Sequence, residues 1–200
     1  NEPLSLRAVS LASVHRRDLP DKIRLKASTA VGAAACFLLV VCLRSYVGLT
    51  LSFPWKGQGS NGLMLLCAVV LGKMAGGILA DIFGVLRVSA VSLGLAAMLF
   101  LFSGYPPAGI AAVFLFNMTM PVTLWAVSQI LPGARGFTFG FLTFGLFLGF
   151  IPVYLGLDPL FSDGAGFASA SVISLALLCS GLTSAGSEWT GHGLTRNISK

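Results

Sequence analysis

The chain has 200 residues, of which 56% are hydrophobic and only 10% are charged, and its formal net charge is +6 at pH 7. Water-soluble domains carry about 25% charged residues, so this composition excludes an ordinary soluble domain. The mean hydropathy is +0.88, and apolar runs of about 20 residues recur, the length at which an α-helix crosses a bilayer. We therefore predict an all-α membrane protein.

Six apolar runs are long enough to be predicted as transmembrane helices. In chain order they cover residues 29–50, 62–80, 85–103, 108–130, 136–156 and 166–184. We expect 29–184 to form a six-helix transmembrane bundle. The polar and basic segment 1–28 is predicted to be a cytoplasmic linker or a helix on the membrane surface, and 185–200 a cytoplasmic tail.

The basic residues predict the orientation of this bundle. If the helices alternate in direction, most of the 13 Lys and Arg residues fall on one side, namely Arg7, Arg16, Arg17, Lys22, Arg24, Lys26, Arg87, Arg135, Arg196 and Lys200. The other side carries Lys56, with Asp158 and Asp163. Because cytoplasmic loops attract Lys and Arg, both termini are predicted to be cytoplasmic, and the short loops suit a bacterial inner membrane. A membrane surface accounts for the positive charge, so we expect no nucleic-acid partner.

The predicted spans are bounded by turn-forming and amphipathic residues. Gly and Pro are frequent in the loops FPWKGQGSNG, SGYPPAG and LDPLFSDGAG. Trp55, Tyr105 and Tyr154 fall near span ends. We expect their rings at the level of the lipid headgroups.

Residues with catalytic or metal-binding chemistry are sparse. The four cysteines lie inside predicted spans and match no metal-ligand spacing, and the two histidines lie in polar ends of the chain. The sequence contains no recognisable nucleophile, acid–base or phosphate-binding constellation. We therefore expect no metal, no cofactor and no enzymatic activity.

The stretch AGGILADIFGVLRV joins the second and third predicted spans. Its pattern Gly77-x-x-x-Asp81-x-x-Gly84 resembles the signature loop of the major facilitator superfamily, a large class of secondary transporters. That family usually has basic residues just after the aspartate and just after the second glycine, whereas here only Arg87 is basic. A weakened copy is typical of the second half of such a transporter. The resemblance therefore implies the C-terminal six-helix half of a twelve-helix protein, with the basic N-terminal segment as linker.

The resemblance also implies a fold and a gate. Each half of these transporters consists of two inverted three-helix repeats, and Asp81 would pair with Arg87 or Arg135 near the cytoplasmic gate. In the family, the glycine lets the second and third helices pack closely, and Gly76 and Gly77 are small enough for such an approach. Asp81 is predicted near the positive N-terminal end of the third span. The alternative is that Asp81 is a plain helix cap at the membrane surface.

Two basic side chains lie inside predicted spans. Lys73 is near the end of the second span, so its long side chain can carry the charge to the interface. Arg44 lies deeper in the first span, where an ionisable group usually faces a partner or a cavity. Asn117 and Thr119 lie at a similar depth in the fourth span, and Pro121 is predicted to kink that span.

These polar positions predict a substrate pathway. The first and fourth spans would be the first helices of the two repeats, which line the central cavity in the family. Arg44, Asn117 and Thr119 are therefore predicted to contact the solute, with Trp125 further along the path. Trp125 has ordinary packing as its alternative role. Since no Asp or Glu lies inside a predicted span, Arg44 either neutralises a carboxylate in the other half or binds an anionic substrate.

Glycines recur along the fifth predicted span. Gly136 and Gly140, and then Gly145 and Gly149, form two G-x-x-x-G pairs, with Pro152 beyond them. Small residues let the backbones of neighbouring helices approach closely. We predict that Gly140, Gly145, Gly149 and Pro152 serve helix packing and hinging.

Taken together, these features predict a secondary active or facilitative transporter that moves a small polar or anionic solute by alternating access. Its expected partners are the lipid bilayer and either the N-terminal six-helix half of the same protein or a second copy of this chain. The alternative is a non-transporting six-helix scaffold or assembly subunit with a similar fold.

Overall fold

The structure, a computed structural model, describes residues 27–57, 59–131, 133–157, 161 and 163–195. The side chains of residues 27, 135 and 186–195 are outside this description. The predicted linker lies outside the described residues up to residue 26, and the end of the predicted tail lies outside them from residue 196 onward.

The described chain is helical, and it contains no strand. Its helices are α2 (Ala27–Thr50), α3 (Asn61–Phe83), α4 (Val85–Leu101), α5 (Pro106–Asn117), α6 (Met120–Ile130), α7 (Arg135–Tyr154) and α8 (Gly164–Thr195). Each predicted span corresponds to one helix, except that the fourth is divided into α5 and α6. The prediction of an all-α protein is therefore confirmed, while α8 continues past the predicted end of its span at residue 184.

Most of these helices have the length and composition of membrane spans. Five helical stretches are long and apolar enough to cross a bilayer, namely Ser28–Thr50, Asn61–Phe83, Pro106–Ile130, Gly136–Tyr154 and Gly164–Ala185. The remaining apolar helix, α4, has 17 residues, or about 25 Å at a rise of about 1.5 Å per residue. That length is at the lower limit for crossing the hydrocarbon layer.

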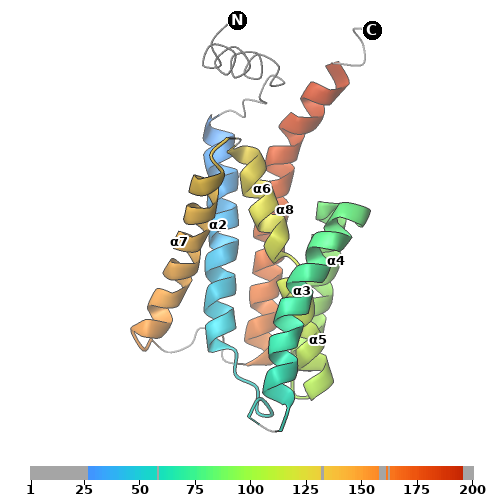
Figure 1. The fold of residues 1–200 in the computed structure, drawn as a ribbon, viewed down its shortest axis with the longest axis vertical. Helices are drawn as coiled ribbons and strands as arrows, with labels where there is room; N and C mark the ends of the chain where they lie inside the picture. The colour runs from blue at the N-terminus through green and yellow to red at the C-terminus, as the bar shows by residue number, and fades with distance from the viewer. Residues whose placement is uncertain (1–26, 58, 132, 158–160, 162, 196–200) are drawn as a thin grey trace, which may run out of the picture.

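The helices run up and down through one bundle (Figure 1). The loops that follow α2, α4 and α7 lie at the lower end, and the turns that follow α3 and α6 lie toward the upper end. Helix α2 packs against α7 and α8, α3 packs against α5, and α4 packs against α5 and α8. Helix α6 contacts α2 and α3 in the middle of the bundle.

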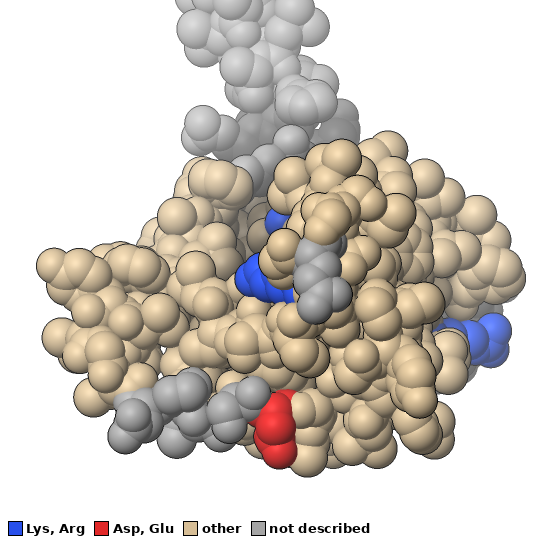
Figure 2. Space-filling model, turned by 90° about the horizontal axis from the view of Figure 1, so that it is seen from below, with Lys and Arg blue, Asp and Glu red and all other residues tan. Residues whose placement is uncertain are grey.

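Large apolar side chains cover the outside of the bundle. Exposed examples on α3 and α7 are Leu63, Met64, Leu66, Leu71, Met74, Ile78, Ile82, Phe137, Phe139, Phe144, Phe147 and Phe150. Seen from the lower end, the described surface is almost wholly made of residues other than Lys, Arg, Asp and Glu (Figure 2). An apolar surface of this extent is unfavourable in water but favourable against lipid chains.

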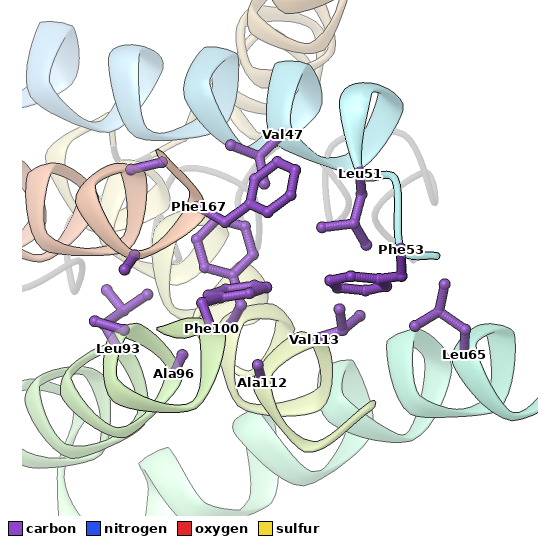
Figure 3. Packing of buried hydrophobic residues seen from close by; sticks show 14 of the residues in the cluster. Val47, Leu51, Phe53, Leu65, Leu93, Ala96, Phe100, Ala112, Val113 and Phe167 are labelled. Carbon is purple, nitrogen blue, oxygen red and sulfur yellow. The ribbon is translucent and has the colours of Figure 1, made fainter. Parts of the chain in front are cut away.

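An aromatic core fills the lower half of the bundle (Figure 3). Phe100 of α4 lies 5.9 Å from Phe116 of α5 and 5.8 Å from Phe167 of α8, measured between ring centroids. Phe53, from the loop after α2, lies 6.2 Å from Phe167. These contacts join the ends of α2, α4, α5 and α8 into one cluster.

The loop after α2 packs into this core. Trp55 is only 4% exposed, its ring stacks on Phe53 at 4.8 Å, and its Nε1 donates a hydrogen bond to the Ser103 carbonyl at 2.9 Å. Trp55 is thus buried within the protein, because Gly109 leaves room for the indole against α5, and its depth at the headgroup level stays a prediction. Tyr105 and Tyr154, by contrast, are exposed near helix ends.

Two glycines bring α3 against the fourth span. A Cβ atom added at Gly72 would overlap the carbonyl oxygen of Phe114, and one added at Gly76 would overlap that of Met118. Gly77 lies next to Pro121, with 3.8 Å between its built Cβ and the proline Cβ. The sequence predicted a close approach of the second and third spans at this point, but these glycines face the fourth span instead.

Two glycines bring α7 against α2 in a similar way. A Cβ at Gly145 would come within 2.9 Å of the Leu38 side chain, and one at Gly149 would overlap the carbonyl oxygen of Cys42. A Cβ at Gly140 would meet nothing within 4 Å, so Gly140 makes no close approach among the described residues. Pro152 lies in the last turn of α7 and is half-buried.

We expect Gly76→Ala and Gly149→Ala each to lower the free energy of unfolding by about 1–3 kcal/mol, because an added methyl group would force two helices apart. Gly94→Ala and Gly140→Ala are matched controls, since their built Cβ atoms meet nothing within 4 Å. Thermal unfolding of the purified chain in detergent would measure all four variants. Equal stability of the two pairs would contradict the packing described above.

Candidate functional site

Arg44 is the buried cation of the described bundle. It lies on α2, six residues before the helix ends at Thr50, or about 9 Å along the axis at a rise of about 1.5 Å per residue. The whole residue is only 6% exposed. A charged group at such a place is costly unless it is hydrogen-bonded or paired, so its neighbours define the site.

The neighbours of Arg44 come from the fourth span. Its Nη2 donates a hydrogen bond to Oγ1 of Thr119. Its guanidinium carbon lies 5.2 Å from the centre of the Phe116 ring, within the range of a cation–π interaction. The structure therefore brings together Arg44 and Thr119, two residues that the sequence predicted at similar depth. Phe116 is a partner that the sequence analysis did not single out.

Thr119 lies at a break in the fourth span. Helix α5 ends at Asn117 and α6 begins at Met120, with Pro121 in the first turn of α6. Because proline has no backbone N–H, it cannot continue the hydrogen-bond ladder with the residue four positions before it. The sequence predicted a kink at Pro121, and the structure has a short interruption of the helix just before it. This interruption places the Thr119 side chain, which is fully buried, beside Arg44.

Only part of the guanidinium is satisfied. Nε and Nη1 of Arg44 are buried and have no hydrogen-bond partner among the described residues. The Phe116 ring stabilises the charge but accepts no conventional hydrogen bond. Asp81 and Asp163, the acidic residues with described side chains, are both exposed and form no ion pair with Arg44 in that part of the chain. Among the described residues, the site thus has unused N–H donors and no carboxylate paired with its positive charge.

Asn117 and Trp125 are not drawn into this cluster. Asn117 donates a hydrogen bond from Nδ2 to the Val113 carbonyl of its own helix at 2.8 Å, and its Cβ faces Gly72 of α3. Trp125 is 41% exposed on α6. Neither has a hydrogen bond to Arg44 in the described structure.

The predicted gating residues lie apart from Arg44, at the junction of α3 and α4. Asp81 is exposed in the last turn of α3, four residues before α4 begins at Val85. Gly84 forms the turn with φ of +90°, a conformation that favours glycine. Arg87 is exposed in the first turn of α4, and no ion pair joins it to Asp81 among the described residues. Helix α7 begins at Arg135, whose side chain lies outside the described part.

Comparison with protein-family models, curated proteins and solved structures found no match.

The sequence contained a usable indication for one of the two residues whose contacts the sequence analysis did not predict. Phe116 lies one residue before Asn117, so a search for aromatic side chains near the predicted depth of Arg44 would have found it. Trp55 gave no such signal, because its burial depends on Gly109 and Ser103, which are far away in the chain.

A double-mutant cycle tests the link between Arg44 and Thr119. We expect Thr119→Val to lower stability by about 1–3 kcal/mol, since it leaves another guanidinium N–H unpaired. In an Arg44→Gln background the same change should cost less, with a coupling of at least about 0.5 kcal/mol. Thermal unfolding in detergent would measure the cycle.

Thr143→Val is the matched control for that cycle. Thr143 is exposed, and its hydroxyl donates to the Phe139 carbonyl of its own helix at 2.9 Å. Its effect should add to that of Arg44→Gln within about 0.5 kcal/mol. Additivity of Thr119→Val with Arg44→Gln would instead show that the contact carries no energy.

Proposed function

We propose that this chain is a six-helix unit of a secondary transporter of the major facilitator type, which moves a small polar or anionic solute by alternating access. The observation that carries this proposal is Arg44, buried beside the break in the fourth span, whose Nε and Nη1 have no hydrogen-bond partner among the described residues. A polar centre of this kind within apolar helices is typical of a solute or ion pathway.

The helix contacts support two inverted repeats. Exchanging α2 with α5–α6, α3 with α7, and α4 with α8 relates several of the helix contacts to one another, whereas the contact of α3 with α4 has no counterpart of similar extent between α7 and α8. The packing of α2 against α7 becomes that of α5 against α3, and the packing of α2 against α8 becomes that of α5 against α4. The contact between α4 and α8 is unchanged by the exchange. Such a pattern is expected from two three-helix units related by a pseudo-two-fold axis.

The glycines support the same relation. Gly72 and Gly76 on α3 lie four residues apart and approach carbonyl groups of the fourth span. Gly145 and Gly149 on α7 have the same spacing, and both approach the backbone of α2. In each case the second helix of one proposed repeat packs against the first helix of the other.

The break in the fourth span supports a pathway at Arg44. Interrupted helices are tolerated at membrane depth where they are buried in protein or line a cavity, and transporters use them to bind solutes. The proposal pairs this unit with a second six-helix half or a second copy. It also places both termini in the cytoplasm of a bacterial inner membrane, following the distribution of basic residues.

A scaffold or assembly subunit is the second candidate. It is favoured by the contacts of Arg44 with Thr119 and Phe116, which tie α2 to α5 and α6 as a structural brace would. In that case Arg44 contributes to folding alone. Solute flux separates the two candidates, because a scaffold moves no solute.

We expect Arg44→Gln and Asp81→Asn each to reduce solute flux at least about tenfold, through loss of the pathway cation and of the gating carboxylate. The assay is uptake or efflux by the full-length protein in lipid vesicles, with anionic and neutral solutes and an imposed pH gradient.

Lys73→Gln and Asp163→Asn are the matched controls, because both side chains are exposed and neither lies at the proposed sites. Both should keep their flux. Membrane insertion of every variant is checked separately. No flux for any solute would favour the scaffold, and flux that none of the four changes affects would contradict the roles proposed for Arg44 and Asp81.

A further inference from the structure

We propose that Arg44 and the N-terminal end of α6 together form a binding site for a small anion, either a carboxylate or an inorganic ion. This site narrows the solute class of the proposed transporter. Its role in transport rests on that proposed function, whereas anion binding itself does not.

The first component is the unsatisfied guanidinium. Arg44 is 6% exposed, and both Nε and Nη1 lack hydrogen-bond partners among the described residues. Buried N–H groups of a charged side chain are rarely left unpaired. Removing them from water costs free energy, and a hydrogen bond to another acceptor offsets that cost. An anion would supply both the acceptor oxygens and the opposite charge.

The second component is the interrupted fourth span. Helix α6 has 11 residues and begins directly after Thr119. The start of a helix has N–H groups without an intrahelical acceptor and carries a partial positive charge, so it attracts anions. Because Arg44 donates to the Thr119 side chain, its guanidinium lies at this helix end.

A buried cation is unfavourable unless it is paired, so the guanidinium charge decides the class of ligand. The start of α6 adds N–H donors of the same sign, although the carbonyl end of α5 lies two residues earlier and Pro121 contributes no N–H. Among the described side chains the acidic residues are Asp81 and Asp163, which are exposed near the ends of the bundle. The Phe116 ring offsets part of this cost but leaves the N–H groups free. A bound anion would satisfy the helix end and the guanidinium at once.

Thermal unfolding of the purified full chain in lipid nanodiscs tests this site. The probes are sodium acetate, sodium chloride and sodium phosphate, with acetamide as the neutral analogue and a bulky sulfonate buffer to hold the ionic strength constant. We expect at least one anion, and not acetamide, to raise the unfolding temperature in a saturable manner. Arg44→Gln should weaken the apparent affinity at least about tenfold, because it removes charged hydrogen bonds.

Lys73→Gln removes the same charge from an exposed position and should leave the affinity unchanged. If Arg44→Gln does not fold, Arg44→Lys keeps the charge and removes the planar set of N–H donors. A several-fold weaker affinity of that variant supports the site, and an unchanged affinity overturns it. No shift with any anion, or an equal shift in Arg44→Gln and Lys73→Gln, also overturns it.

Binding and flux can fail separately. Arg44-dependent anion binding without flux would keep this site and refute the transporter. Flux of a neutral solute without Arg44-dependent anion binding would keep the transporter and refute the site.

Discussion

The close approach of α3 to the fourth span is the constraint on which much of this bundle depends. Gly76 lies against the Met118 carbonyl, where a side chain would not fit, and Gly72 lies against Phe114 one turn away. This contact holds the point at which α5 ends and α6 begins. The break in turn places Thr119 toward α2, where it meets Arg44. The absence of a side chain at Gly76 on α3 thereby helps to set the position of the Arg44 charge on α2.

Arg44 shows how an apolar bundle accommodates a charge. Its described partners are the hydroxyl of Thr119, which lies in the break between α5 and α6, and the face of Phe116, which lies in the last turn of α5. An unbroken helix would have used its backbone groups internally and presented a different face to α2. The break therefore exchanges regular backbone hydrogen bonds for a polar centre inside the apolar bundle.

The polar centre and the aromatic core meet at Phe116. One face of this ring lies near the Arg44 guanidinium, and the ring also packs against Phe100 in the lower cluster. That cluster includes Phe53 and Trp55 of the loop after α2, which fold inward at the lower end.

The sequence by itself determined the helices and their solvent, because apolar runs near 20 residues reflect the bilayer around each segment. It also indicated Arg44, Thr119 and the interruption before Pro121, since a buried charge and a proline are costly wherever the chain folds. Only the tertiary structure decided that Gly76 meets the fourth span, that Trp55 is buried and that Asn117 turns away from Arg44. These outcomes depend on contacts between residues far apart in sequence, such as the 75 positions between Arg44 and Thr119. Hydropathy and spacing along one helix do not specify which neighbour a side chain will meet.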